Sequence, residues 1–123
     1  MKGFNFRQEM AIKEELERFL KNVVNSMAKL DLVIFFYNNP HTIDTVDGLA
    51  ARIGRRVERI GKDIEELSEA EVVEKRIQGD LVLYSFSSNP ESYALVGKFL
   101  KDLDDREIRL KVITYIIKLE GLT

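Results

Sequence analysis

Charged side chains are distributed unevenly between residues 52 and 71. The first half, 52–62, contains one acid, Glu58, whereas the second half, 63–71, contains no base. The bases are Arg52, Arg55, Arg56, Arg59 and Lys62, and the acids that follow are Asp63, Glu65, Glu66, Glu69 and Glu71. A helix dipole favours the reverse order, by roughly 0.3–1 kcal/mol per charge. The chain carries 19 bases and 21 acids, so it is no polycation, and any binding of nucleic acid must come from a local patch such as this one.

Other side chains offer little chemistry. The chain has no cysteine, which excludes disulfides, thiolate metal sites and cysteine nucleophiles. His41 is the one histidine and follows a proline, and one imidazole does not complete a zinc site. The sequence has no Gly-rich phosphate loop, and Asp104-Asp105 is typical of a helix cap. We therefore expect no enzyme activity, no metal site and no cofactor.

The composition indicates one globular domain over residues 1–123. The chain is 45% hydrophobic and 33% charged, and its length allows one core but not two. No apolar run approaches the ~20 residues that cross a bilayer, and the N-terminus mixes acids and bases where a signal peptide is apolar. We expect a cytoplasmic protein without a membrane partner. Abundant Lys, Glu and Ile are also typical of heat-tolerant proteins.

The first half of the chain predicts helices. Apolar residues recur every three or four positions over 8–27, and the apolar pattern continues to a stop at Pro40. The pattern leaves open whether 8–38 is one bent helix or two. Asp44 or Thr45 then caps a short helix that closes at Gly54, and a further helix over about 56–70 follows directly.

After residue 70 the apolar period changes to two. The runs 72–77 and 81–86 predict a β-hairpin around Gln78-Gly79-Asp80. Ser88-Asn89-Pro90 begins another helix, and a last helix extends through Leu119. That last helix is apolar on two sides, which a single core rarely needs. One side carries Ile108, Val112, Ile116 and Leu119, and the other carries Leu110, Ile113 and Ile117.

This order of elements resembles the winged-helix transcriptional regulators, in particular the dimeric ArsR-like and MarR-like groups. The stretches that carry the resemblance are TVDGLAARIG, VERIGKDIEELSEAEVVEKR and LVLYSF, and the likeness covers about residues 28–100. One departure is Glu71, because these families usually place a glycine there to turn the chain into the wing. No cluster of cysteine or histidine matches the metal-sensing members, so metal sensing is not implied.

The resemblance implies a mainly α fold with a small β-hairpin, a winged-helix core at 28–100 and dimerisation helices at 8–27 and 104–120. The helix at 56–70 would enter the major groove of double-stranded DNA, and a homodimer would place two such helices roughly 34 Å apart on a palindrome. The DNA-binding residues would be Arg55, Arg56, Glu58, Arg59, Lys62, Lys75 and Arg76. The dimer interface would contain Ile12, Leu16, Phe19, Val23, Ile108, Val112, Ile116 and Leu119.

Two other interpretations are open. The charged helix could be a solvated surface laced by i,i+4 pairs, namely Glu58 with Lys62, Arg59 with Asp63 and Lys62 with Glu66. The winged helix could also have lost DNA contact and bind proteins, which the net acidity and the acidic wing tip at Asp80 favour. The sequence does not identify a small-molecule effector, and its aromatic residues are more typical of a core than of an effector pocket.

Overall fold

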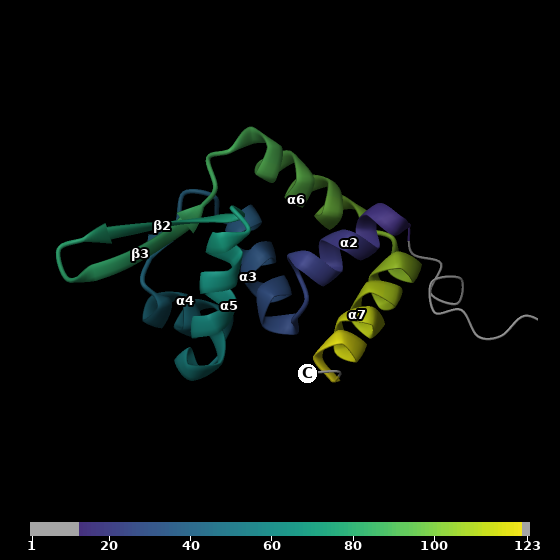
Figure 1. Ribbon diagram of the computed structural model, residues 1–123, viewed down its shortest axis with the longest axis horizontal. Coiled ribbons are helices and arrows are strands. Elements are labelled where there is room, and N and C mark those ends of the chain that lie inside the picture. Colours follow the sequence, from purple (N-terminus) through teal and green to yellow (C-terminus); the bar gives the residue numbers. More distant parts are fainter. Residues whose placement is uncertain (1–12, 122–123) are drawn as a thin grey trace, which may run out of the picture.

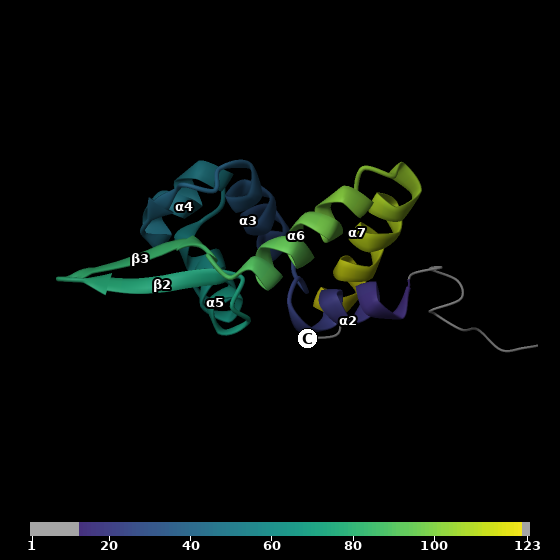
Figure 2. The same cartoon turned by 90° about the horizontal axis from the view of Figure 1, so that it is seen from above.

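The computed structural model describes residues 13–121, which form helices and one small antiparallel sheet (Figure 1). Helices make up most of the molecule, and the hairpin of the sheet projects from one side of them (Figures 1 and 2). In chain order the elements are α2 (Glu14–Asn22), α3 (Met27–Asn38), β1 (Ile43–Asp44), α4 (Val46–Ile53), α5 (Val57–Glu69), β2 (Val73–Gln78), β3 (Leu81–Phe86), α6 (Pro90–Asp102) and α7 (Arg106–Gly121).

The segment that was predicted as one or two helices forms two. Helix α2 ends at Asn22, and α3 begins at Met27 after a loop over 23–26. Ser26 is the N-cap of α3, where its hydroxyl accepts a hydrogen bond from the backbone N–H of Lys29. Residues 8–12 of the predicted helix lie outside the described residues.

The sheet has the strand order β1-β3-β2, and the β2–β3 hairpin is the predicted wing. Its turn contains Gly79 at φ 62°, a conformation that glycine adopts without steric cost. Glu71, which precedes the wing, also has a positive φ of 63°. Glu71, at the turn into the wing, therefore has the left-handed backbone conformation that glycine usually provides.

One core joins the central and terminal helices. Its fully buried side chains come from most elements and include Leu20, Leu32, Phe36, Leu49, Ile60, Ile64, Leu67, Val96, Val112 and Ile116. Among the described residues, no helix is both long and apolar enough to span a bilayer.

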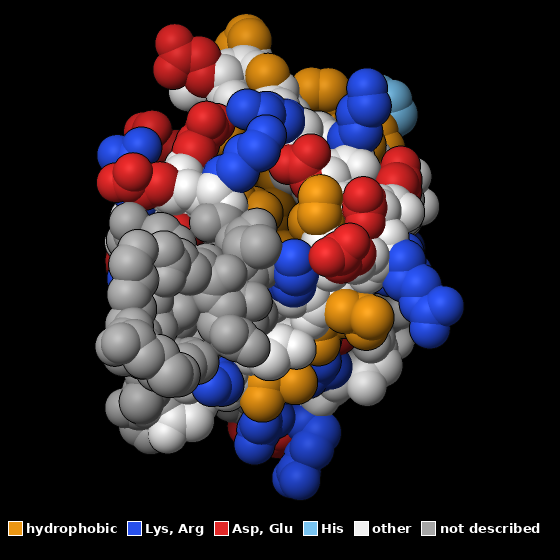
Figure 3. Space-filling view, turned by 90° about the vertical axis from the view of Figure 1, so that its right-hand side faces the viewer, with side chains coloured by type: hydrophobic (Ala, Val, Ile, Leu, Met, Phe, Trp, Pro, Cys, Tyr) orange, Lys and Arg blue, Asp and Glu red, His pale blue; other side chains and the backbone are white. Residues whose placement is uncertain are grey.

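Helix α7 turns one of its two apolar faces inward. Val112 and Ile116 are fully buried within the chain, whereas Leu110 and Ile117 are 53% and 57% exposed. Of the other residues predicted at a dimer interface, Phe19 is buried, Leu16, Val23, Ile108 and Leu119 are half-buried, and Ile12 lies outside the described residues. Seen from the side on which α2 and α7 lie, apolar side chains are interspersed with charged ones (Figure 3). The periodicity identified both faces of α7, but it could not say which one the chain itself would cover.

Candidate nucleic-acid interface

The candidate interface is built on the α4–turn–α5 unit. Thr45 caps α4 by accepting from the N–H of Gly48, and Gly54, at φ 70°, ends the helix in the left-handed conformation. Helix α5 begins after two intervening residues and buries Ile60, Ile64 and Leu67 completely. Because these three side chains fix one face of α5 to the core, its charged residues are left on the outer and lateral faces.

The bases at the start of α5 differ in their surroundings. Arg55 Nε donates to Asp31 Oδ2 at 2.6 Å, so this arginine ties the α4–α5 turn to α3. Arg56 is mostly exposed, with Glu58 at 3.7 Å. Arg59 and Lys62 are exposed and form no ion pair with another residue of the described range 13–121. The first two turns of α5 therefore present Arg56, Arg59 and Lys62 to the surroundings.

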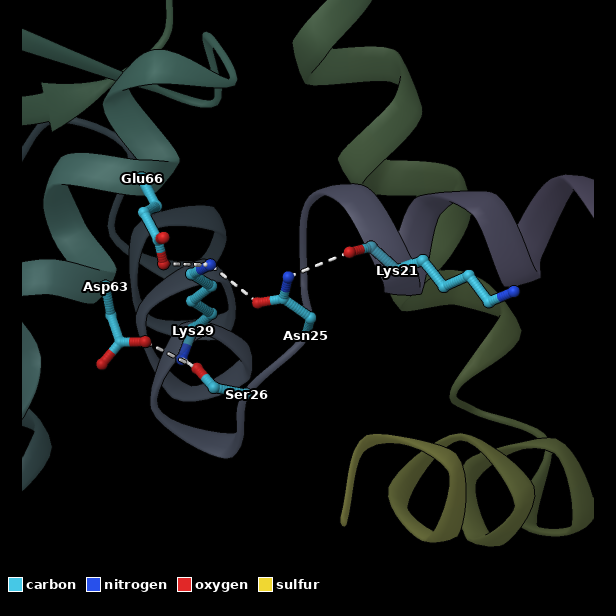
Figure 4. Close-up of polar contacts among 6 residues, drawn as sticks. All are labelled: Lys21, Asn25, Ser26, Lys29, Asp63 and Glu66. Atoms are coloured by element: carbon cyan, nitrogen blue, oxygen red, sulfur yellow. Dashed lines mark hydrogen bonds and ion pairs between the residues drawn. The ribbon is translucent and has the colours of Figure 1, made fainter. Parts of the chain in front are cut away.

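Three of the acids that follow are held by other elements. Asp63 accepts a hydrogen bond from the Ser26 hydroxyl at 2.8 Å, and Glu66 pairs with Lys29 Nζ at 2.8 Å (Figure 4). The hydrogen bond from Lys29 lowers the pKa of Glu66. Both contacts join α5 to the beginning of α3.

Glu65 joins α5 to the wing. It accepts hydrogen bonds from the Tyr84 hydroxyl and from Lys75 Nζ. The Lys75 nitrogen lies 3.0 Å from the nearer carboxylate oxygen of Glu65. The Tyr84 bond, and then the Lys75 bond, lower the pKa of Glu65. Burial, together with the bond to Glu65, raises the pKa of Tyr84 to about 12. The tyrosine therefore stays protonated and donates to a carboxylate at neutral pH.

The wing offers fewer bases than the sequence suggested. Lys75 lies opposite Tyr84 in the ladder and is directed to Glu65, whereas Arg76 is the next residue and points to the other face of the hairpin. The wing tip is apolar and acidic, with Ile77 70% exposed, Leu81 53% exposed and Asp80 in the turn.

The predicted DNA-binding residues fall into two groups, those that are accessible at the surface and those that are held by carboxylates of the chain. Arg56, Glu58, Arg59 and Lys62 lie together on the first turns of α5, and Arg76 is exposed on the wing. Arg55 and Lys75 are engaged by carboxylates of the chain itself. None of the i,i+4 pairs of the surface-helix interpretation forms an ion-pair contact within the described residues, and Asp63 and Glu66 bind Ser26 and Lys29. Those residues also contain no group of three side chains placed to hold a metal ion.

Sequence reasoning missed Lys29. This lysine is 3% exposed and lies among the apolar residues of α3. A charged residue at an apolar position of a helical pattern was the available signal, since a buried ammonium requires partners. The sequence could not identify those partners.

The fold is similar to that of the AntR antimony-specific transcriptional repressor. The crystal structure of that protein matches with a TM-score of 0.57 and 17% sequence identity, over 73% of this chain and 78% of that chain. A possible transcriptional regulator from Methanosarcina mazei Go1 matches with a TM-score of 0.48 and 16% identity, over 81% of this chain and 77% of that chain. No family model and no curated protein sequence matches this chain. The likeness to AntR, with the helices and three-stranded sheet described above, confirms the predicted winged-helix fold.

Proposed function

We propose that this chain is a DNA-binding transcriptional regulator that places α5 in the major groove of duplex DNA. The observation that carries the proposal is the division of α5 into two halves. Its first turns expose Arg56, Arg59 and Lys62, whereas Asp63, Glu65 and Glu66 are bound to α3 and to the wing. A recognition helix contacts base edges with its N-terminal residues, so the bases meet the DNA and the acids stay behind.

The residues at this surface have different roles in the proposal. Arg56 and Arg59 are long enough to reach guanine edges or phosphates, and Lys62 meets the backbone. Glu58 accepts from a cytosine amino group. Arg55 acts indirectly, because its bond to Asp31 fixes the turn that starts α5. On the wing, Arg76 is the base available to the flanking phosphates.

We also propose a homodimer that forms through the outer face of α7. Leu110, Ile113, Thr114 and Ile117 form a narrow stripe on that face, with its centre between residues 113 and 114. Antiparallel pairing with a second copy about this centre places Leu110 opposite Ile117 and is self-complementary, as a two-fold interface must be.

The charges beside the stripe are compatible with the same antiparallel arrangement. Helical spacing places Glu107 and Lys118 on one side of the stripe, and Arg106 and Glu120 on the other. Antiparallel pairing brings Glu107 near Lys118 and Arg106 near Glu120 of the second copy. The charge swap Glu107→Lys should weaken the dimer in sedimentation equilibrium, and adding Lys118→Glu should restore it.

DNA binding is tested by fluorescence anisotropy with labelled mixed-sequence duplex DNA over a salt series. The variant Arg59→Ala/Lys62→Ala removes two exposed bases from α5. The control Lys98→Ala/Lys101→Ala removes the same charge from α6. Each phosphate contact that is lost lowers the slope of log K against log salt by about 0.9. We expect the α5 variant to lose affinity and slope while the control keeps both. Absence of wild-type binding at about 50 mM salt would sink the DNA proposal.

A second candidate function is protein binding through the wing. The exposed Ile77 and Leu81 beside Asp80 favour it, since an apolar and acidic tip suits a protein surface better than phosphates. Binding of that kind changes little with salt, so the same salt series distinguishes the two functions.

A further inference from the structure

The loop over residues 23–26 lies between the terminal helices and α5. Helix α7 packs on α2 and α3, whereas α5 packs on α3, α4 and β2. Between α5 and the end of α7 the surface is hollowed, and the hollow is lined by Asp63 and Glu66 on one side, by Leu119 and Glu120 on the other, and by the loop. The loop and the first turn of α3 therefore bridge α5 and the terminal helices.

Lys29 binds the loop to α5. Its side chain is buried, and its ammonium donates to Asn25 Oδ1 at 2.7 Å and pairs with Glu66 Oε1 at 2.8 Å (Figure 4). Asn25 belongs to the loop and Glu66 to α5. Because a buried ammonium that loses a partner is costly, the loop and α5 cannot easily separate.

Ser26 makes the second connection. Its hydroxyl oxygen accepts from the N–H of Lys29 at 3.0 Å and its hydroxyl donates to Asp63 Oδ1 at 2.8 Å. One side chain thus caps α3 and holds α5. A shift of the loop disturbs both bonds at once.

The loop and the first residue of α3 are hydrogen-bonded to α2 and α7. Asn25 Nδ2 donates to the carbonyl of Lys21 in α2 at 2.9 Å, and the N–H of Met27 donates to Glu120 Oε1 in α7 at 2.7 Å. A displacement of α2 or α7 therefore acts on the residues that hold α5.

We propose that Asn25, Ser26 and Lys29 form a joint that couples the orientation of α5 to that of α2 and α7. They are positioning residues, since they act on α5 and not on a bound partner. The consequence for regulation rests on the proposed function. If α5 enters DNA and α7 forms the dimer, the joint links dimerisation and DNA binding, and the linkage is reciprocal.

Hydrogen exchange of the intact protein without DNA tests the joint. Glu120→Ala cuts the bond from α7 to the start of α3. The control Glu91→Ala removes an exposed carboxylate of α6, which belongs neither to the joint nor to the proposed dimer face. Hydrogen exchange of both variants is measured in the wild-type background and in a Lys29→Met/Ser26→Ala background. A circular dichroism melt confirms that each protein is folded. If the double background does not fold, Ser26→Ala alone replaces it, because it removes the bond to Asp63 and the cap of α3 but leaves both partners of the buried Lys29 in place.

We expect Glu120→Ala to raise exchange of the buried-face amides of α5 about five-fold, the effect of losing one net hydrogen bond. Glu91→Ala should leave α5 unchanged, and the effect of Glu120→Ala should vanish in the background that lacks the joint. An unchanged α5 overturns the proposal, as does an equal effect of the control or an effect that persists without the joint. Since no DNA is present, these results are independent of whether the chain binds DNA.

Discussion

Replacing Glu71 by glycine should stabilise the fold. Glu71 is the one residue other than glycine with a positive φ among the described residues, and its N–H is bonded to the carbonyl of Ser68 at 3.0 Å. Its side chain is exposed and makes no hydrogen bond or ion pair within that range, so removing it sacrifices no side-chain contact. The left-handed conformation costs a residue with a Cβ about 1–2 kcal/mol. Glycine removes this cost, but its greater conformational freedom in the unfolded chain lowers stability by about 0.5–1 kcal/mol. The net gain is about 0.5–1 kcal/mol.

Thermal and urea unfolding at a fixed protein concentration measure this gain, because self-association would otherwise shift the midpoint. For a chain of this size we expect Glu71→Gly to raise the Tm by roughly 2–4 °C. Glu71→Ala is the matched control, since it removes the charge and keeps the Cβ, and it should leave the Tm nearly unchanged. An equal rise in both variants would show that the carboxylate, and not the backbone, was responsible. A fall in Glu71→Gly would refute the strain argument outright.

Three further predictions concern the elements that hold α5. Hydrogen bonds lower the pKa values of Glu65 and Glu66 in the folded protein from their ordinary value of 4.5. The stability that the two ionised carboxylates contribute is therefore present above pH 4.5 and is lost as the pH falls through their pKa values in the folded state. Between about pH 6 and 3, the free energy of unfolding measured with urea should therefore fall less in Glu66→Gln than in wild type. Thr45→Ala should cost about 1 kcal/mol in the same assay, and Thr45→Ser should recover most of it, because the hydroxyl caps α4. Tyr84→Phe should remove a phenol that ionises near pH 12 in an ultraviolet titration, since the pKa of Tyr84 is raised to about 12, and a titration unchanged at high pH would contradict that assignment.

Most of the fold could be predicted from local sequence patterns. The switch from a helical to a two-residue period located the wing, and Thr45 and Gly54 marked the ends of α4 because a cap and a left-handed residue are local requirements. The break between α2 and α3 was harder to find. Val23 and Val24 continue the apolar stripe through the loop, so no change of period marks it. The two-residue strand β1 is too short to show any period.

The site was less predictable than the fold because its contacts join distant residues. The partners of Asp63, Glu65 and Glu66 are Ser26, Tyr84, Lys75 and Lys29, none of which is a helical neighbour. A pattern read along α5 offers i,i+4 pairs, but each of those acids has a partner from another element. The sequence could place the bases at the start of the helix, yet only the packed structure distinguishes Arg55, held by Asp31, from the more exposed Arg59.

These contacts also explain the reversed charge order of α5. Acids at its C-terminal end oppose the helix dipole by roughly 0.3–1 kcal/mol each, so isolated helix stability does not favour them there. Three of them instead fix the second half of the helix, to α3 through Ser26 and Lys29 and to the wing through Tyr84. A helix fixed at that end holds its first turns at a defined angle to the core. The order that disfavours the helix alone thus suits a helix that must present Arg56, Arg59 and Lys62 in one orientation, and partners that hold the acids offset the dipole cost.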